Sequence, residues 1–280
     1  MTTWIISEAT AEAMKGQTAL KTYLQRVYDA RFYWIHLARI ELKNKFRRSK
    51  LGLLWTFVSP LCLTAIMSIV FSVAFNMDIV TYAPYILSGI LVWELVSASF
   101  NAGGMAIVGN ESYIRQFSHP ITIYTLKSAI VYTISFLISM TALVLWMLVT
   151  EPKNLLVGLI TLPLTALLLF CLSWGATTIA AYTFTRYRDY PQMVALILQT
   201  IWYLSPVFLQ ESMFLSNPVL SKWFSINPVT HMLALVRKPF LQGSFAEWID
   251  YAYMFGIIIV AGCVAFRMNR NNEKDIIFYI

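Results

Sequence analysis

The side chains that could do chemistry in this sequence are few and far apart. His36, His119 and His231 stand in three separate segments, without cysteine or acidic residues at metal-ligand spacing. No glycine is followed by lysine, so a GxxxxGK[ST] phosphate loop is missing, and neither a GxSxG motif nor a carboxylate pair in a predicted cavity indicates an enzyme. We expect a chain that is not an enzyme and that binds no metal or cofactor.

Glu94 is the one acidic residue near the middle of a long apolar stretch, GILVWELVSASFNAGG. A charge at such a depth costs roughly 2.5–3.5 kcal/mol on insertion scales, so the side chain should face protein or water. Two roles stay open: a hydrogen-bonded glutamate that joins helices, or a pore-lining residue that handles protons. No second charge lies well inside an apolar stretch, which disfavours a proton-coupled carrier.

Aromatic residues recur within and at the ends of the apolar stretches. Many of them are explained by anchoring at the membrane interface. Flat aromatic faces also offer sugar rings apolar contact without strong directional bonds. The predicted translocation path accordingly comprises Trp55, Tyr85, Glu94, Trp202 and Tyr203.

The elements that position these residues are membrane helices, because 58% of the 280 residues are hydrophobic and only 12% are charged. Apolar runs of about 20 residues predict spans. The formal charge of +7 is concentrated near the span ends, which is typical of membrane topology and indicates no nucleic-acid partner. Most lysines and arginines fall on one side if both termini are cytoplasmic. The six predicted spans are 52–76, 83–107, 121–149, 155–182, 193–209 and 250–267.

The two ends of the chain flank one membrane domain, residues 51–267. Residues 1–50 form a predicted cytoplasmic N-terminus with an amphipathic interface helix at about 28–46, and residues 268–280 a cytoplasmic tail. Basic residues gather just before the first span, where they meet anionic lipid headgroups and resist translocation. They are Arg31, Arg39, Lys43, Lys45, Arg47, Arg48 and Lys50.

Residues 205–243 are too interrupted by proline for a full span and too apolar for water. Two short re-entrant helices, at about 211–223 and 229–240, are the favoured interpretation, and an ordinary folded external loop is the alternative. The link 103–120 is predicted to be cytoplasmic and could hold a short helix across the membrane face. The fold class is therefore an all-α polytopic membrane protein.

In their order and spacing, several stretches resemble the membrane subunit of ABC-2-type exporters for O-antigen, capsule and teichoic-acid polymers. They are FRRSKLGLLWTFVSPL, YILSGILVWELV, GNESYIRQFSHP, the RYRD turn, YLSPVF and INPVTHMLALVRKPFLQG, and they extend over nearly the whole chain. The resemblance implies a homodimeric channel for lipid-linked polysaccharide, O-antigen first, in the bacterial inner membrane. It also implies two separate ATPase subunits that bind ATP and Mg. Capsule or teichoic-acid export, lipid or drug export, and a proton-coupled carrier using Glu94 are the alternatives.

The resemblance also assigns roles to residues at the two ends of the bundle. Coupling to the ATPase falls to the interface helix, the 103–120 link and the charged turn before the fifth span. The external gate falls to the re-entrant segments. The coupling residues are Arg39, Asn110, Glu111, Tyr113, Ile114, Arg115, Arg188 and Asp189, and the gate residues are Pro206, Met213, Asn227, Pro228 and His231.

Overall fold

The computed structural model describes residues 23, 25–45, 49–117, 119–211, 213, 217–273 and 275–280. All regular secondary structure in this part of the chain is helical. The elements are α2 (Arg31–Lys45), α3 (Leu54–Phe75), α4 (Ile79–Val108), α5 (Glu111–Gln116), α6 (Thr122–Thr150), α7 (Pro152–Arg186), α8 (Tyr190–Tyr203), α10 (Pro218–Ile226), α11 (Pro228–Leu241), α12 (Trp248–Asn272) and the 3₁₀ turn η1 (Ile276–Phe278).

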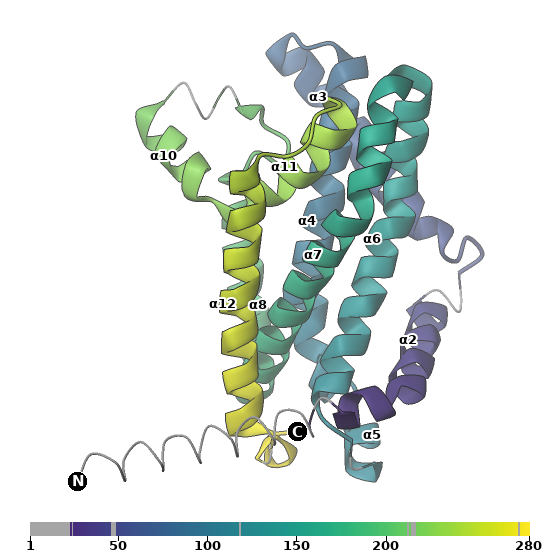
Figure 1. The fold of residues 1–280 in the computed structure, drawn as a ribbon, viewed down its shortest axis with the longest axis vertical. Helices are drawn as coiled ribbons and strands as arrows, with labels where there is room; N and C mark the ends of the chain where they lie inside the picture. Colours follow the sequence, from purple (N-terminus) through teal and green to yellow (C-terminus); the bar gives the residue numbers. More distant parts are fainter. Residues whose placement is uncertain are drawn as a thin grey trace, which may run out of the picture.

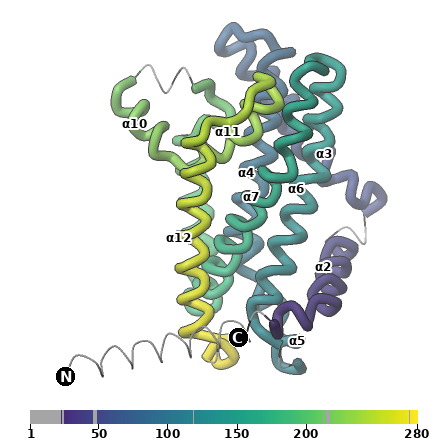
Figure 2. The backbone as a smooth tube through the Cα atoms, viewed as in Figure 1, coloured from purple at the N-terminus to yellow at the C-terminus, as the bar shows by residue number. Residues whose placement is uncertain are grey.

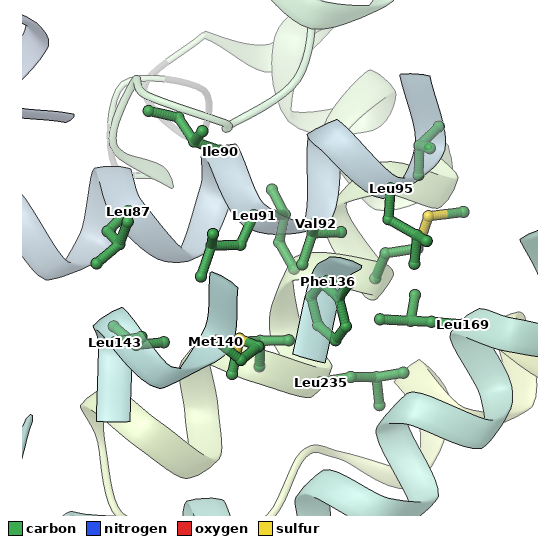
Figure 3. Packing of buried hydrophobic residues seen from close by; sticks show 14 of the residues in the cluster. Leu87, Ile90, Leu91, Val92, Leu95, Phe136, Met140, Leu143, Leu169 and Leu235 are labelled. Atoms are coloured by element: carbon green, nitrogen blue, oxygen red, sulfur yellow. The ribbon is translucent and has the colours of Figure 1, made fainter. Parts of the chain in front are cut away.

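The long helices form a bundle with short helices at both ends (Figure 1). α2 and α5 lie at one end, where α12 also ends, whereas α10 and α11 lie at the opposite end, as the backbone trace also shows (Figure 2). α4 occupies the centre and packs against α3, α6, α7, α8 and α11. Leu91 of α4, Met140 of α6 and Leu235 of α11 meet in the main apolar core (Figure 3).

Five helices among the described residues are long and apolar enough to cross a membrane: Leu54–Phe75, Ile79–Gln116, Thr122–Thr150, Pro152–Arg186 and Trp248–Asn272. They confirm a multi-pass helical membrane protein. The third predicted span, 121–149, matches α6 within one residue at each end. The predicted count of six spans is not confirmed, because α8 has only 14 residues and ends at Tyr203, before the predicted limit of 209.

Gly103 and Gly104, where the predicted second span 83–107 and the predicted link 103–120 overlap, lie inside α4 and serve packing. A Cβ on Gly103 would come within 3.1 Å of Thr177 in α7, and one on Gly104 within 3.2 Å of Tyr190 in α8. Small residues let helix backbones approach closely, as is typical of membrane helix contacts. The short helix predicted for this link is present, but as α5, after α4 has ended.

The helix predicted at about 28–46 corresponds to α2, which is Arg31–Lys45. Phe46, Arg47 and Arg48, together with residues 1–22, lie outside the described part of the chain. Within α2 Leu37 and Ala38 are buried, and the partly buried side chains of Tyr33, Trp34 and Leu42 also pack against the bundle.

The segment after α8 contains the two short helices that its prolines predicted, with different bounds. α11 extends one residue beyond each end of the predicted 229–240, whereas α10 begins at Pro218 instead of about 211. Asparagine caps begin both, because Asn217 accepts from Val219 N and Asn227 from Val229 N. α11 is almost entirely buried and α10 has no buried residue, so α11 belongs to the core and α10 to the surface.

Candidate functional site

A cavity of about 430 Å³ lies between α3, α4 and α6. Its wall combines aromatic faces with small hydroxyl-bearing side chains and two charged residues, Lys45 and Glu94. The wall residues are Lys45, Trp55, Thr56, Ser59, Pro60, Trp93, Glu94, Leu95, Ser97, Ala98, Asn101, Ala102, Tyr132, Ser135, Phe136 and Ser139.

Glu94 lies on α4 with its side chain exposed to this cavity. The Lys45 ammonium at the end of α2 attracts the Glu94 carboxylate electrostatically. One and two turns further along α4, Ser97 and Asn101 continue the polar lining, and Asn101 Nδ2 donates to Ser97 Oγ at 3.1 Å. A bond of 2.7 Å from Ser139 Oγ to the Thr56 carbonyl joins α6 to α3 across the wall.

The structure brings together only part of the predicted translocation path. Trp55 and Glu94 line the same cavity. Tyr85, Trp202 and Tyr203 are instead grouped around residues 204–209, which follow α8. Tyr85 Oη donates to the Leu209 carbonyl at 2.9 Å, and the Trp202 ring lies 5.1 Å from that of Tyr203.

Arg237, to which the sequence assigned no role, is fully enclosed at the point where these aromatic residues meet. Its Nη1 donates to the Pro206 carbonyl at 2.6 Å, and its Nη2 donates to the Val207 carbonyl at 2.8 Å and the Tyr85 carbonyl at 3.2 Å. Nε faces Ser88 Oγ at 3.3 Å. The guanidinium thus binds the carbonyls of Pro206 and Val207, which belong to non-helical backbone within the bundle, and the Tyr85 carbonyl of α4.

The predicted gate residues fall into two groups. Asn227 Nδ2 donates to Ser205 Oγ at 2.8 Å, which ties the start of α11 to the turn that contains Pro206, and Pro228 opens α11 directly after Asn227. Met213 N donates to the Gln210 carbonyl at 3.1 Å.

His231 forms the second group, with residues at the start of α12. Its Nδ1 lies 2.8 Å from Asp250 Oδ1, its Nε2 lies 3.1 Å from the Ser225 carbonyl, and its ring stacks on Tyr253 with centroids 4.0 Å apart. His231 therefore joins α10, α11 and α12.

Lys238 completes a charged network with the same aspartate, because its Nζ donates to both Asp250 Oδ2 and Glu247 Oε1 at 2.8 Å. Burial lowers the pKa of Lys238, but the hydrogen bonds to Asp250 and Glu247 outweigh it, so the pKa lies above the usual lysine value. The lysine keeps its charge and balances the two carboxylates.

The predicted coupling residues at the other end are only partly in contact with each other. In α5 the Arg115 Nε donates to Glu111 at 2.8 Å, Ile114 is buried and Tyr113 is exposed. Asn110 is buried at the joint between α4 and α5. Arg39 lies exposed on α2, and Arg188 and Asp189 lie exposed in the turn between α7 and α8.

These features define a helical multi-pass membrane protein with a polar cavity between its long helices. Residues 33–241 match the model of the ABC-2 type transporter family, so the chain belongs to that family. This confirms the resemblance inferred from the sequence motifs.

The curated relatives that the chain matches are all named as O-antigen export permeases. An O-antigen export system permease protein RfbA of Klebsiella pneumoniae is 23% identical over 240 residues, which cover 85% of this chain and 92% of the relative. A protein of the same name from Myxococcus xanthus is 24% identical over 220 residues, which cover 78% of this chain and 84% of the relative.

Proposed function

We propose that this chain is the membrane subunit of an ATP-driven exporter that moves a lipid-linked polysaccharide, with O-antigen as the first candidate. The observation that carries the proposal is the cavity beside Glu94, in a chain whose relatives are named as O-antigen export permeases. Hydroxyl, amide and carboxylate groups pair with sugar hydroxyls, and Trp55 and Trp93 offer flat apolar faces. A moving polymer needs many weak contacts of this kind.

The proposed exporter contains two copies of this chain and two ATPase subunits, which bind ATP and Mg. The outer faces of α3 and α12 support a lipid-facing or subunit-facing position, because most of their apolar side chains are not covered by the chain itself. The ATPase would contact α5, α2 and the exposed turn at Arg188 and Asp189. This chain would convert movement of the ATPase into opening of the path.

The proposed setting is the bacterial inner membrane, with α2, α5 and the end of α12 on the cytoplasmic side. α8 together with residues 204–209 would make the fifth of six crossings, and Arg237 would stabilise its non-helical part. α10 and α11 would then lie at the external mouth as re-entrant elements and form the gate.

The decisive experiment is purification of the tagged chain together with the ATPase encoded beside it, followed by reconstitution into lipid vesicles. We expect a complex of fixed composition that hydrolyses ATP and moves lipid-linked polysaccharide only when ATP and Mg are supplied. A strain without the chain should lose surface polysaccharide and retain the lipid-linked polymer in its membrane.

A chain that purifies alone and moves solute in response to a proton gradient would contradict the proposal and favour the carrier alternative. If the complex moves lipids or drugs with ATP but does not move the polymer, the proposed ATP-driven mechanism stands and the proposed polysaccharide substrate is wrong. Export of capsule or teichoic-acid polymers, measured in the same vesicles, shows which of the polysaccharides the complex moves.

A further inference from the structure

Lys127 lies near the start of α6 with its ammonium group buried between three segments of the chain. Nζ is 2.8 Å from Glu41 Oε2 of α2 and donates at 2.8 Å to Asn110 Oδ1. A buried ammonium requires such partners, because removing either one leaves a charge or a polar group poorly satisfied. The arrangement therefore fixes the relative positions of α2, α6 and residue 110.

Asn110 is the joint at which α4 ends and α5 begins. Its Nδ2 donates to the Ala106 carbonyl at 2.8 Å, near the end of α4, and its own carbonyl accepts from the backbone N of Tyr113 and Ile114 in α5, at 3.0 Å each. The side chain that Lys127 holds thus belongs to the residue that sets the direction of α5.

A second contact joins α2 to the other end of α5. The Tyr33 ring of α2 lies 5.9 Å from Phe117, the residue after α5, and 4.6 Å from the ring of His119. α2 is therefore attached on both sides of α5, by aromatic contacts at one end and through Lys127 at the other. These contacts add to the apolar attachment of α2, in which Leu37 and Ala38 are buried and Trp34 and Leu42 pack against the core clusters.

We infer that Lys127 is a positioning residue that makes α2 and α5 move as one unit, so that a displacement of α5 reaches α2 and the start of α6 together. The inference rests on the proposed function, in which an ATPase pushes on α5. Lys45, at the end of α2, also lines the cavity beside Glu94, so the same unit extends from the ATPase side to the wall of the cavity.

The first test measures movement in the chain itself. Spin labels are placed at Asn44→Cys in α2 and Ser112→Cys in α5, both exposed, after Cys62, Cys171 and Cys263 are replaced by alanine. The distance distribution should be narrow in the parent, which has both Glu41 and Lys127, and broad in Glu41→Gln and Lys127→Met. Glu41 is partly exposed, so Glu41→Gln should fold even if Lys127→Met does not. Equal widths in Glu41→Gln and the parent overturn the inference, whether or not an ATPase is found.

The second test uses the complex of this chain with its ATPase. It measures coupling as the number of ATP molecules hydrolysed for each polymer exported. We expect this ratio to rise about fivefold in Glu41→Gln and Lys127→Met, as for the loss of a moderate coupling energy. The charge exchange of Glu41→Lys with Lys127→Glu should restore it in part. Lys153→Met, which removes an exposed lysine at the opposite end, is the matched control. A merely structural role would lower hydrolysis and export together and leave the ratio unchanged, which also overturns the inference.

The two tests separate the inference from the proposed function. If no ATPase binds, the proposed function fails while the distance measurement still decides whether Lys127 links α2 and α5. If the complex exports polymer and Glu41→Gln leaves the ratio unchanged, the proposed function stands and the role of Lys127 in coupling fails.

Discussion

The guanidinium of Arg237 lies over the ring of Tyr85, with its central carbon 3.6 Å from the ring centroid. The same tyrosine donates from Oη to the Leu209 carbonyl, while Arg237 binds the carbonyls of Pro206 and Val207. One arginine from α11 and one tyrosine from α4 therefore hold the turn that follows α8.

Replacement of Arg237 should destabilise the protein strongly. Arg237→Met would leave the buried Val207 carbonyl without its side-chain donor and remove the shortest hydrogen bond to the Pro206 carbonyl. An unsatisfied buried group costs about 1–3 kcal/mol, so we expect a loss of about 3 kcal/mol. Thermal unfolding in detergent measures it, with Lys222→Met on exposed α10 as the control. Equal unfolding temperatures for the two variants would show that the turn does not depend on the guanidinium.

Tyr85→Phe separates the hydroxyl from the ring. This variant keeps the aromatic face under Arg237 and loses the hydroxyl that donates to the Leu209 carbonyl at 2.9 Å and lies 3.4 Å from the Pro206 carbonyl, so we expect a loss of about 1 kcal/mol. The same unfolding assay applies. A loss as large as that of Arg237→Met would mean that the hydroxyl, not the guanidinium, holds the turn.

Gly89 in α4 faces the same turn without a side chain. A Cβ there would collide with the Val207 carbonyl and lie 2.9 Å from Arg237 Nη2. Overpacking of a well-packed site typically costs 1–3 kcal/mol, so Gly89→Ala should lose about that much stability and most of the export. Gly256→Ala, where the added carbon meets nothing within 4 Å, is the matched control and should be neutral. Normal export by Gly89→Ala would show that residues 204–209 can shift freely.

Asp250 contacts both Lys238 and His231 at the start of α12, so its charge should matter more than that of its exposed neighbour Glu247. Asp250→Asn would weaken both Lys238 and His231 contacts and should cost about 3 kcal/mol, the scale of a broken buried pair. Glu247→Gln removes an exposed partner and should cost about 0–1 kcal/mol. Similar unfolding temperatures for both variants would contradict the importance of the buried network.

The cavity wall should respond to substitution gradually. If many weak contacts carry the polymer, Trp55→Ala, Trp93→Ala and Glu94→Gln should each lower the export rate only about two- to fivefold, and the triple variant far more. ATP-driven export by the reconstituted complex is the measurement. Complete loss in Glu94→Gln alone, with ATP hydrolysis intact, would point to proton handling by that carboxylate.

Much of the fold could be predicted because apolar length and proline positions are local signals. α6 follows from an uninterrupted apolar run, and α11 follows from Pro228 and the amphipathic stretch after it. The end of α8 could not be predicted in this way. Its helix stops at Tyr203, and the carbonyls after it are bound by Arg237, about thirty residues later in the chain.

The site was predicted less completely than the fold, since its residues meet through tertiary contacts. The sequence indicated that Glu94 faces water or protein, and the structure places it beside a cavity with Trp55. The sequence analysis also assigned Tyr85 to this path with Trp55 and Glu94. In the structure Tyr85 instead contacts Arg237 and the turn after α8. The one available signal for Arg237 was its position inside an apolar helical stretch, HMLALVRKPF, where an unpaired charge requires partners.

The attachment of α10 has a mechanical consequence. Trp223 of this exposed helix donates from Nε1 to the Leu204 carbonyl at 2.7 Å, and Leu204 begins the turn that Arg237 holds two residues further on. This hydrogen bond thus connects an exposed helix directly to a turn inside the bundle. An antibody fragment that clamps α10 would act on the interior of the protein without entering it.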